Sequence, residues 1–166
     1  MENDQEVPQP QGQPSKGKGT TLLHYTPDGN FQLHCTAKVI SSCHGSIEEP
    51  QHVQILLDVT CLHPQGGGQP CDYGTIGNEK FHVSVHKVLL DPETRIVTHY
   101  GILQKGTLVD IMDSSTVQVV VDPVRRSILS QCHSAGHAID AAIAICYPSL
   151  VATKGYHYLD GPYVVR

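Results

Sequence analysis

The chain has 166 residues, a length typical of about one domain, with 39% hydrophobic and 16% charged residues, no Trp, 15 Gly and 11 Pro. This composition excludes a large multidomain machine and favours a turn-rich β fold over a helical bundle. The formal net charge of −5 argues against a general nucleic-acid binder, but residues 123–166 carry four bases and two acids, so contact with a polyanion should favour that end.

Residues 1–19 are predicted to form a disordered tail. They consist mainly of Gln, Pro, Gly, Lys and Glu with a single Val, and such a segment buries too little apolar surface to offset the entropy of ordering. No run approaches the roughly 18 apolar residues that span a bilayer, and the N-terminus lacks the apolar centre of a signal peptide. We therefore expect a soluble, cytoplasmic protein that makes no membrane contact, and its six Cys should be thiols.

Short strands are predicted over residues 20–121. Apolar and polar residues alternate through 31–39 and 53–61, and shorter apolar runs follow at 81–89, 96–100 and 117–121. A period of two places each apolar set on one face of a sheet, and turn residues separate the runs. The sequence predicts a small antiparallel β-barrel domain that carries a Gly-Gly-Gly-Gln loop.

The periodicity changes at Asp122, which suits the N-cap of a helix, while Pro123 suits the first helical position. Apolar residues then recur at steps of three and four as far as Cys146, and Tyr147-Pro148 ends the pattern. Residues 122–166 are therefore predicted as a second, partial domain built on a long helix. The predicted fold class is α+β, with a barrel followed by this helix.

Two histidines of the predicted helix, His133 and His137, stand four residues apart and so share one face, a spacing that suits a zinc ion. Gly136 lies between them, and a Gly inside a helix costs about 1 kcal/mol, which suggests that another group approaches closely. The alternative is a chance spacing in a chain with 11 His. Zinc needs further ligands, and the candidates without diagnostic spacing are Cys61, His63, Cys71, Cys132, Cys146 and His157.

Three consecutive glycines, Gly66, Gly67 and Gly68, follow a predicted strand and precede Gln69. They expose backbone N–H groups and permit the close approach of a ligand backbone or a sugar-phosphate. The loop is not a phosphate-binding loop of the nucleotide-hydrolase type. Such a loop ends in Gly-Lys-Ser or Gly-Lys-Thr and is followed by a helix, and this sequence has neither feature. The alternative interpretation is a flexible hairpin loop.

The order of these motifs resembles a known family, the editing domain of alanyl-tRNA synthetases and its free-standing AlaX-type relatives. The resemblance covers about residues 20–166. The residues that carry it are Thr60, the Leu62-His63-Pro64 turn, Gly66-Gly67-Gly68-Gln69-Pro70, Asp72, Gly74, His99-Tyr100-Gly101, Asp122-Pro123-Val124-Arg125-Arg126, His133, His137, Lys154-Gly155-Tyr156-His157-Tyr158 and Asp160-Gly161-Pro162-Tyr163-Val164.

The resemblance implies hydrolysis of seryl- or glycyl-tRNA(Ala), so the partner would be the acceptor end of tRNA(Ala) carrying a wrong amino acid. It also implies that Gln69 and Thr60 are catalytic residues, with Thr60 recognising a seryl hydroxyl. The implied zinc ligands are His133 and His137, two of the four that a Zn²⁺ ion takes in the family. The residues implied in substrate binding are Gly66, Gly67, Gly68, Asp72 and Arg126. A full aminoacyl-tRNA ligase is not expected, because an ATP-binding core does not fit beside this domain in 166 residues.

The sequence departs from the family pattern in two places. The Cys-x-x-x-His motif that supplies the other two zinc ligands is absent, so the ligand set in this chain is incomplete. A shortened product, a partner or a replacement ligand would each account for this. In addition, His63 stands where the family has an aromatic residue.

Two other hypotheses therefore remain beside the zinc-dependent deacylase. One is a catalytically inactive or truncated relative that binds tRNA or an aminoacyl group without metal. The other is a structural zinc protein in which two chains each contribute two histidines. If the family fold packs the helix against a C-terminal part that this chain lacks, the apolar face of residues 124–143 is partly exposed and should promote self-association.

Overall fold

The computed structural model describes residues 19–45, 48–114 and 116–165. The predicted tail thus lies outside the described residues, apart from Gly19. Among the residues that are described, no helix is long and apolar enough to cross a membrane. The elements are β1 (Thr21–Leu22), η1 (Leu23–Tyr25), η2 (Gly29–Phe31), β2 (His34–Ala37), β3 (Val39–His44), β4 (His52–Leu57), β5 (Val59–Thr60), β6 (Gly74–Gly77), β7 (His82–Leu90), β8 (Val97–Lys105), α1 (Leu108–Met112), β9 (Val117–Val121), α2 (Pro123–Cys146), β10 (Lys154–Tyr156) and β11 (Tyr163–Val165).

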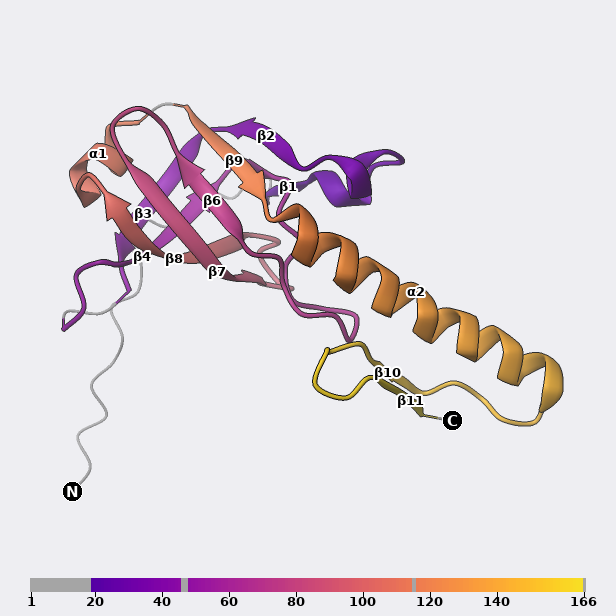
Figure 1. Cartoon of the computed structure of the whole chain (residues 1–166). Helices are drawn as coiled ribbons and strands as arrows, with labels where there is room; N and C mark the ends of the chain where they lie inside the picture. The colour runs from indigo at the N-terminus through magenta and orange to yellow at the C-terminus, as the bar shows by residue number, and fades with distance from the viewer. Residues whose placement is uncertain (1–18, 46–47, 115, 166) are drawn as a thin grey trace, which may run out of the picture.

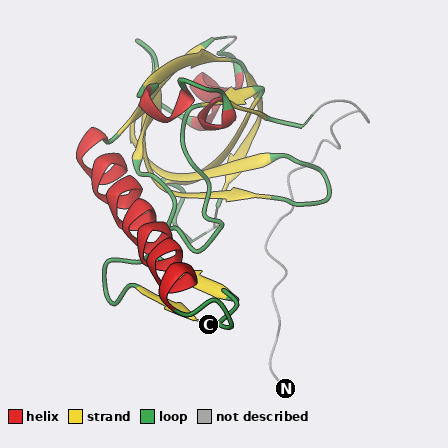
Figure 2. Cartoon of the chain, turned by 90° about the vertical axis from the view of Figure 1, so that its right-hand side faces the viewer, coloured by secondary structure: helices red, strands yellow, loops and turns green. Residues whose placement is uncertain are grey.

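Seven of the strands form one antiparallel sheet in the order β2-β9-β6-β7-β8-β4-β3. The sheet curls into a ring when it is viewed end-on (Figure 2). The ends of the strand order, β2 and β3, follow one another in the chain with only Lys38 between them. The predicted α+β class, with an antiparallel barrel-like sheet and a long helix, is confirmed.

The interior of the ring is filled by the apolar side chains that alternate along the strands. In β9, Val117, Val119 and Val121 are buried and the residues between them are exposed, as a period of two requires. A register shift between Val85 and Lys87 in β7 lets Val88 point inward again. The barrel therefore has a continuous apolar core that supports the loops at its rim.

Two strand predictions differ from the structure. The alternation that began at Phe31 was extended too far, because Phe31 belongs to the 3₁₀ turn η2, where its amide donates to Asp28 O, and its side chain is 84% exposed. Strand β6 was not predicted, since Gly-Thr-Ile-Gly contains one large apolar residue, Ile76. It forms because both of its edges pair with valine-rich neighbours, β7 and β9.

Helix α2 begins and ends where the sequence predicts. The Asp122 carboxylate accepts hydrogen bonds from the backbone N–H groups of Val124 and Arg125, and Pro123 occupies the first turn. The helix leaves the barrel and extends outward, with the β10–β11 hairpin alongside it (Figure 1). Most of its apolar residues are exposed, and the three buried residues of the helix are Arg126, Leu129 and Gly136.

Candidate functional site

The Gly-rich loop is a two-residue hairpin turn. Gly66 and Gln69 exchange backbone hydrogen bonds of 3.1 and 3.0 Å, and the residues between them, Gly67 and Gly68, have φ values of 59° and 77°. Two consecutive positive φ values are typical of a type I′ turn and favour glycine. A Cβ on Gly68 would lie 2.2 Å from the carbonyl oxygen of Gly155 in β10. The turn is thus seated directly on the C-terminal hairpin.

Gln69 connects this turn to the two-histidine helix. Its side-chain Oε1 lies 2.7 Å from His133 Nδ1, and His133 Nε2 lies 2.8 Å from His137 Nε2. A carbonyl oxygen only accepts, so this assignment of the amide places the His133 proton on Nδ1 and leaves the lone pair on Nε2. Burial lowers the pKa of His133, and His157 and His137 lower it further.

A third histidine, His157, completes the cluster from the hairpin. Its ring stacks on His133 with centroids 4.5 Å apart and an interplanar angle of 23°. The ring also lies against Gly136, where a Cβ would come within 2.3 Å of Cε1. The close approach that the helical glycine predicted is therefore made by His157, which is buried.

The donor set for zinc is present in part. The Nε2 atoms of His133 and His137 converge, and Gln69 holds His133 in the tautomer that a metal ligand needs. His157 presents its ring face to His133. Within the described ranges, no group of three or more His, Cys, Asp or Glu could hold a metal. The pair fits as two ligands, and a complete zinc site needs donors beyond it.

The predicted substrate-binding residues Asp72 and Arg126 are buried and paired with each other. Arg126 Nε lies 3.2 and 3.0 Å from the two carboxylate oxygens of Asp72, and its terminal nitrogens donate to the carbonyl oxygens of Asn30 and Cys61. Asp72 also accepts the backbone N–H of His63 at 2.7 Å. These groups are engaged within the protein, so the pair ties α2 to the barrel instead of facing a groove.

Thr60, predicted as catalytic, is fully buried and its hydroxyl is engaged with His99. Because the carbonyl of Ile55 accepts from His99 Nδ1 at 3.0 Å, Nε2 accepts the Thr60 hydroxyl proton at 2.9 Å. The Thr60 oxygen accepts the Leu62 N–H in turn. Burial lowers the pKa of His99 to about 4. The structure thus brings Gln69 to the histidine cluster, while Thr60 contacts His99 and Leu62 in the barrel interior.

Sequence reasoning gave no signal for His24, whose ring packs against that of His63 with centroids 4.5 Å apart and an interplanar angle of 43°. Burial lowers the pKa of His24 to about 3, and the positive charges of His63 and Arg126 add to the effect. Burial also lowers the pKa of His63. Both ring nitrogens of His24 and Nδ1 of His63 are buried without a hydrogen-bond partner. Unpaired buried nitrogens of this kind destabilise the fold unless a polar group meets them.

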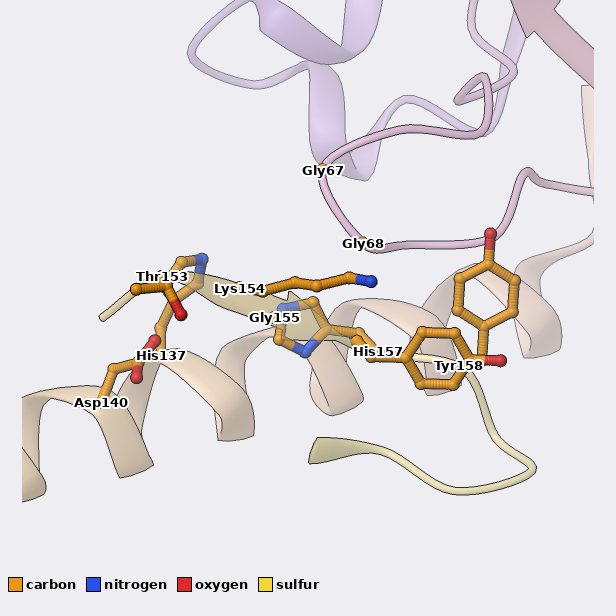
Figure 3. A pocket seen from close by; sticks show the side chains of 10 residues that line it. Gly67, Gly68, His137, Asp140, Thr153, Lys154, Gly155, His157 and Tyr158 are labelled. Atoms are coloured by element: carbon orange, nitrogen blue, oxygen red, sulfur yellow. The ribbon is translucent and has the colours of Figure 1, made fainter. Parts of the chain in front are cut away.

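A groove of about 500 Å³ passes between the Gly-rich turn and the hairpin. Figure 3 shows His137 and Asp140 at one end, Gly68 and His157 at the middle, and Tyr158 at the other end. Lys154 also lines it. The groove thus gives a ligand access to the glycines and to the histidine cluster at once.

The comparisons with known proteins identify the family. The family model for class II (A) tRNA synthetases matches residues 13–125, a range that contains the Gly-rich turn and ends before His133. The chain belongs to this family. Its relatives include alanine–tRNA ligases, which confirms the resemblance to alanyl-tRNA synthetases and is consistent with an editing-type domain.

Three relatives illustrate the extent of the similarity, all of them alanine–tRNA ligases. The protein of Pelotomaculum thermopropionicum is 30% identical over 120 residues, 69% of this chain and 13% of the relative. That of Desulfosudis oleivorans is 31% identical over 134 residues (78% and 14%), and that of Clostridioides difficile is 35% identical over 98 residues (59% and 11%). The chain thus spans between 11 and 14% of the length of these curated relatives.

Proposed function

We propose that the protein is a zinc-dependent aminoacyl-tRNA deacylase that hydrolyses seryl- or glycyl-tRNA(Ala), a quality-control step of translation. The contact between Gln69 Oε1 and His133 Nδ1 is the observation that carries this proposal. It joins two motifs that stand 64 residues apart in the sequence into one site beside an open groove. An ester at the end of a single-stranded nucleic acid can enter such a groove, since the groove is open to solvent.

In the reaction, water adds to the ester carbonyl carbon, the bond from that carbon to the ribose oxygen breaks, and the ribose oxygen takes up a proton. The chain offers backbone donors for the carbonyl oxygen: Gly67 and Gly68 line the groove, and among the described residues their N–H groups have no internal acceptor. Zinc, when bound, polarises the carbonyl or lowers the pKa of a bound water.

The remaining residues position these groups. Gln69 holds His133 with its Nε2 lone pair free of a proton, and His157 covers one face of the His133 ring against water. Gly136 leaves the space that His157 occupies. We expect His133 and His137 to provide two zinc ligands, with the others coming from groups outside this cluster.

The test is the release of serine or glycine from tRNA(Ala) charged with either amino acid, with zinc supplied. We expect multiple turnovers, loss of turnover in His133→Ala, and no change in Ser134→Ala, which alters an exposed neighbour on the same helix. Zinc in freshly purified protein should be close to one per chain and should be lost in His133→Ala. No release of either amino acid by the zinc-loaded protein would refute the proposal.

A second candidate is a binding relative without catalysis. The observation that favours it is the number of metal donors. Two imidazole nitrogens converge, but the described residues contain no group of three or more donors that could hold a metal ion. It predicts that the protein binds the acceptor end of tRNA(Ala) with no turnover and little zinc. The same deacylation assay separates the two functions.

A further inference from the structure

A second groove, of about 440 Å³, meets the histidine-lined groove at Tyr158, which lines both. Its walls come from four parts of the chain. Tyr73 follows the Gly-rich turn, Lys87 belongs to β7, Arg125 to the first turn of α2, and Asp160 to the turn of the hairpin. None of these four residues belongs to the histidine cluster or its groove. Because Tyr158 lines both grooves, the two grooves adjoin each other.

Two contacts hold the Arg125 side chain at the wall of this groove. Its guanidinium lies over the Tyr73 ring, with Cζ 3.7 Å from the ring centroid, and its Nε donates to the carbonyl oxygen of Cys71 at 3.0 Å. Within the described ranges, its two terminal nitrogens have no hydrogen-bond acceptor. The next residue, Arg126, has its donors engaged with Asp72 and two carbonyl oxygens. Arg126 is therefore engaged inside the protein, and of the two adjacent arginines only Arg125 lines the groove.

The hairpin adds an aromatic platform. Tyr156 stacks on Tyr158 at 4.4 Å and 15°, and on Tyr163, its partner across the two strands, at 5.0 Å and 16°. Tyr158 is thus braced by its neighbour and stands at the end of the first groove that lies opposite His137 and Asp140 (Figure 3). A braced, half-buried ring at a groove wall is suited to stack against a flat ligand.

The charges of the second groove are mixed but favour an anion. Lys87 and Arg125 line it with the exposed imidazole of His86, against the single carboxylate of Asp160. That carboxylate accepts the Tyr156 hydroxyl at 3.3 Å. Lys87 Nζ also lies 5.1 Å from the centroid of the Tyr100 ring. In a chain of net charge −5, this groove is lined by two cationic side chains and by two tyrosine rings, those of Tyr73 and Tyr158.

We propose that the second groove binds the single-stranded nucleotide that precedes the esterified terminal nucleoside of the tRNA. Arg125 and Lys87 bind its phosphate, and Tyr158 stacks on a base. Proteins that bind single-stranded nucleic acid combine such a cationic groove with aromatic rings. The inference rests on the proposed function, because an ester held at the histidine cluster leaves the preceding nucleotides to pass Tyr158.

The test measures binding and needs no hydrolysis. A fluorescent acceptor-stem minihelix of tRNA(Ala), uncharged and with a short single-stranded 3′ overhang, is titrated with the protein, and the same minihelix without the overhang is the reference. We expect the overhang to strengthen binding. Arg125→Ala, Lys87→Ala and Tyr158→Ala should each weaken binding of the overhang by about ten-fold, and each of the first two should lower the salt slope by about 0.7.

Matched variants separate this result from general effects. Lys105→Ala removes an exposed charge away from the groove and should bind as the wild type does, and Tyr158→Phe should retain stacking. Arg125→Lys keeps the charge but loses the planar stack on Tyr73, so it should fall between. Equal thermal midpoints would show that the variants are folded.

Equal binding of the two minihelices, or wild-type affinity in all three alanine variants, would overturn the inference. Because the ligand carries no amino acid, an inactive protein that still shows the expected losses would refute the proposed hydrolysis alone. An active protein without these losses would refute the second groove alone.

Discussion

Replacing Gln69 by Met tests the link between the Gly-rich turn and the histidine cluster. Gln69 is 5% exposed, and Met has a similar length but no carbonyl acceptor. In the variant, His133 Nδ1–H loses its partner at 2.7 Å in a half-buried position. Leaving a buried donor unpaired costs about 1–3 kcal/mol. Loss of a residue that orients a metal-binding histidine lowers metal affinity by about 10- to 100-fold, which is the same range of free energy.

Two measurements follow this variant. The zinc affinity is obtained by competition with a chelator, and the position of the His133 proton is read from the imidazole ¹⁵N shifts in NMR spectra. We expect the proton on Nδ1 in the wild type, and a mixture of tautomers with about 10- to 100-fold weaker zinc binding in Gln69→Met. Gln69→Glu, which keeps an acceptor, should restore the tautomer.

The matched control is Gln131→Met, which changes an exposed glutamine on the same helix as His133 and should leave both readouts unchanged. A proton on Nε2 of His133 in the wild type would refute the reasoning. So would a Gln69→Met protein that binds zinc as tightly as the wild type.

Four other changes probe the scaffold. Gly136→Ala should lower the free energy of unfolding by about 1 kcal/mol in urea denaturation despite the better helix propensity of Ala, because the new methyl group meets the buried His157 ring. His63→Phe should raise it by about 1 kcal/mol, because a buried nitrogen without a partner is removed. The pKa of His99 is lowered to about 4, so the folded state favours the neutral imidazole. The stability that this provides is complete above pH 6.5, and about 3 kcal/mol of it is lost as the pH falls toward 4. His99→Gln should therefore reduce the loss of stability over this pH range. Ile145, 80% exposed on α2, should promote self-association, and Ile145→Glu should reduce it in sedimentation.

The controls for these changes come from the same chain. Gly161→Ala meets no atom within 4 Å and should be neutral, and His82→Gln, at an exposed position, should keep the wild-type pH profile. A more stable Gly136→Ala, a less stable His63→Phe, or a His99→Gln protein with the wild-type pH dependence would each contradict the corresponding argument. Sedimentation of the wild type as a monomer at all concentrations would contradict the association.

Much of the fold could be predicted because its causes are local. Helix α2 follows from Asp122, Pro123 and the apolar period, and β9 follows from alternating valines. Strand β6 and the β10–β11 hairpin could not be predicted in this way. Strand β6 forms because β7 and β9 pair with its two edges. Strands β10 and β11 pair with each other, and the segment between them contacts the Gly-rich turn, where the His157 N–H donates to Gly68 O at 2.8 Å.

For the site, the sequence by itself determined which residue types are present: a turn that only glycines form readily, a glutamine beside it, and two histidines on one helix face. The tertiary structure alone decided their partners. It placed Gln69 on His133, put His157 into the space above Gly136, and directed Arg126 into the protein while Arg125 faces a groove. The physical reason is that turn conformation and helix periodicity depend on neighbouring residues, whereas hydrogen bonds and burial depend on residues that the fold brings together.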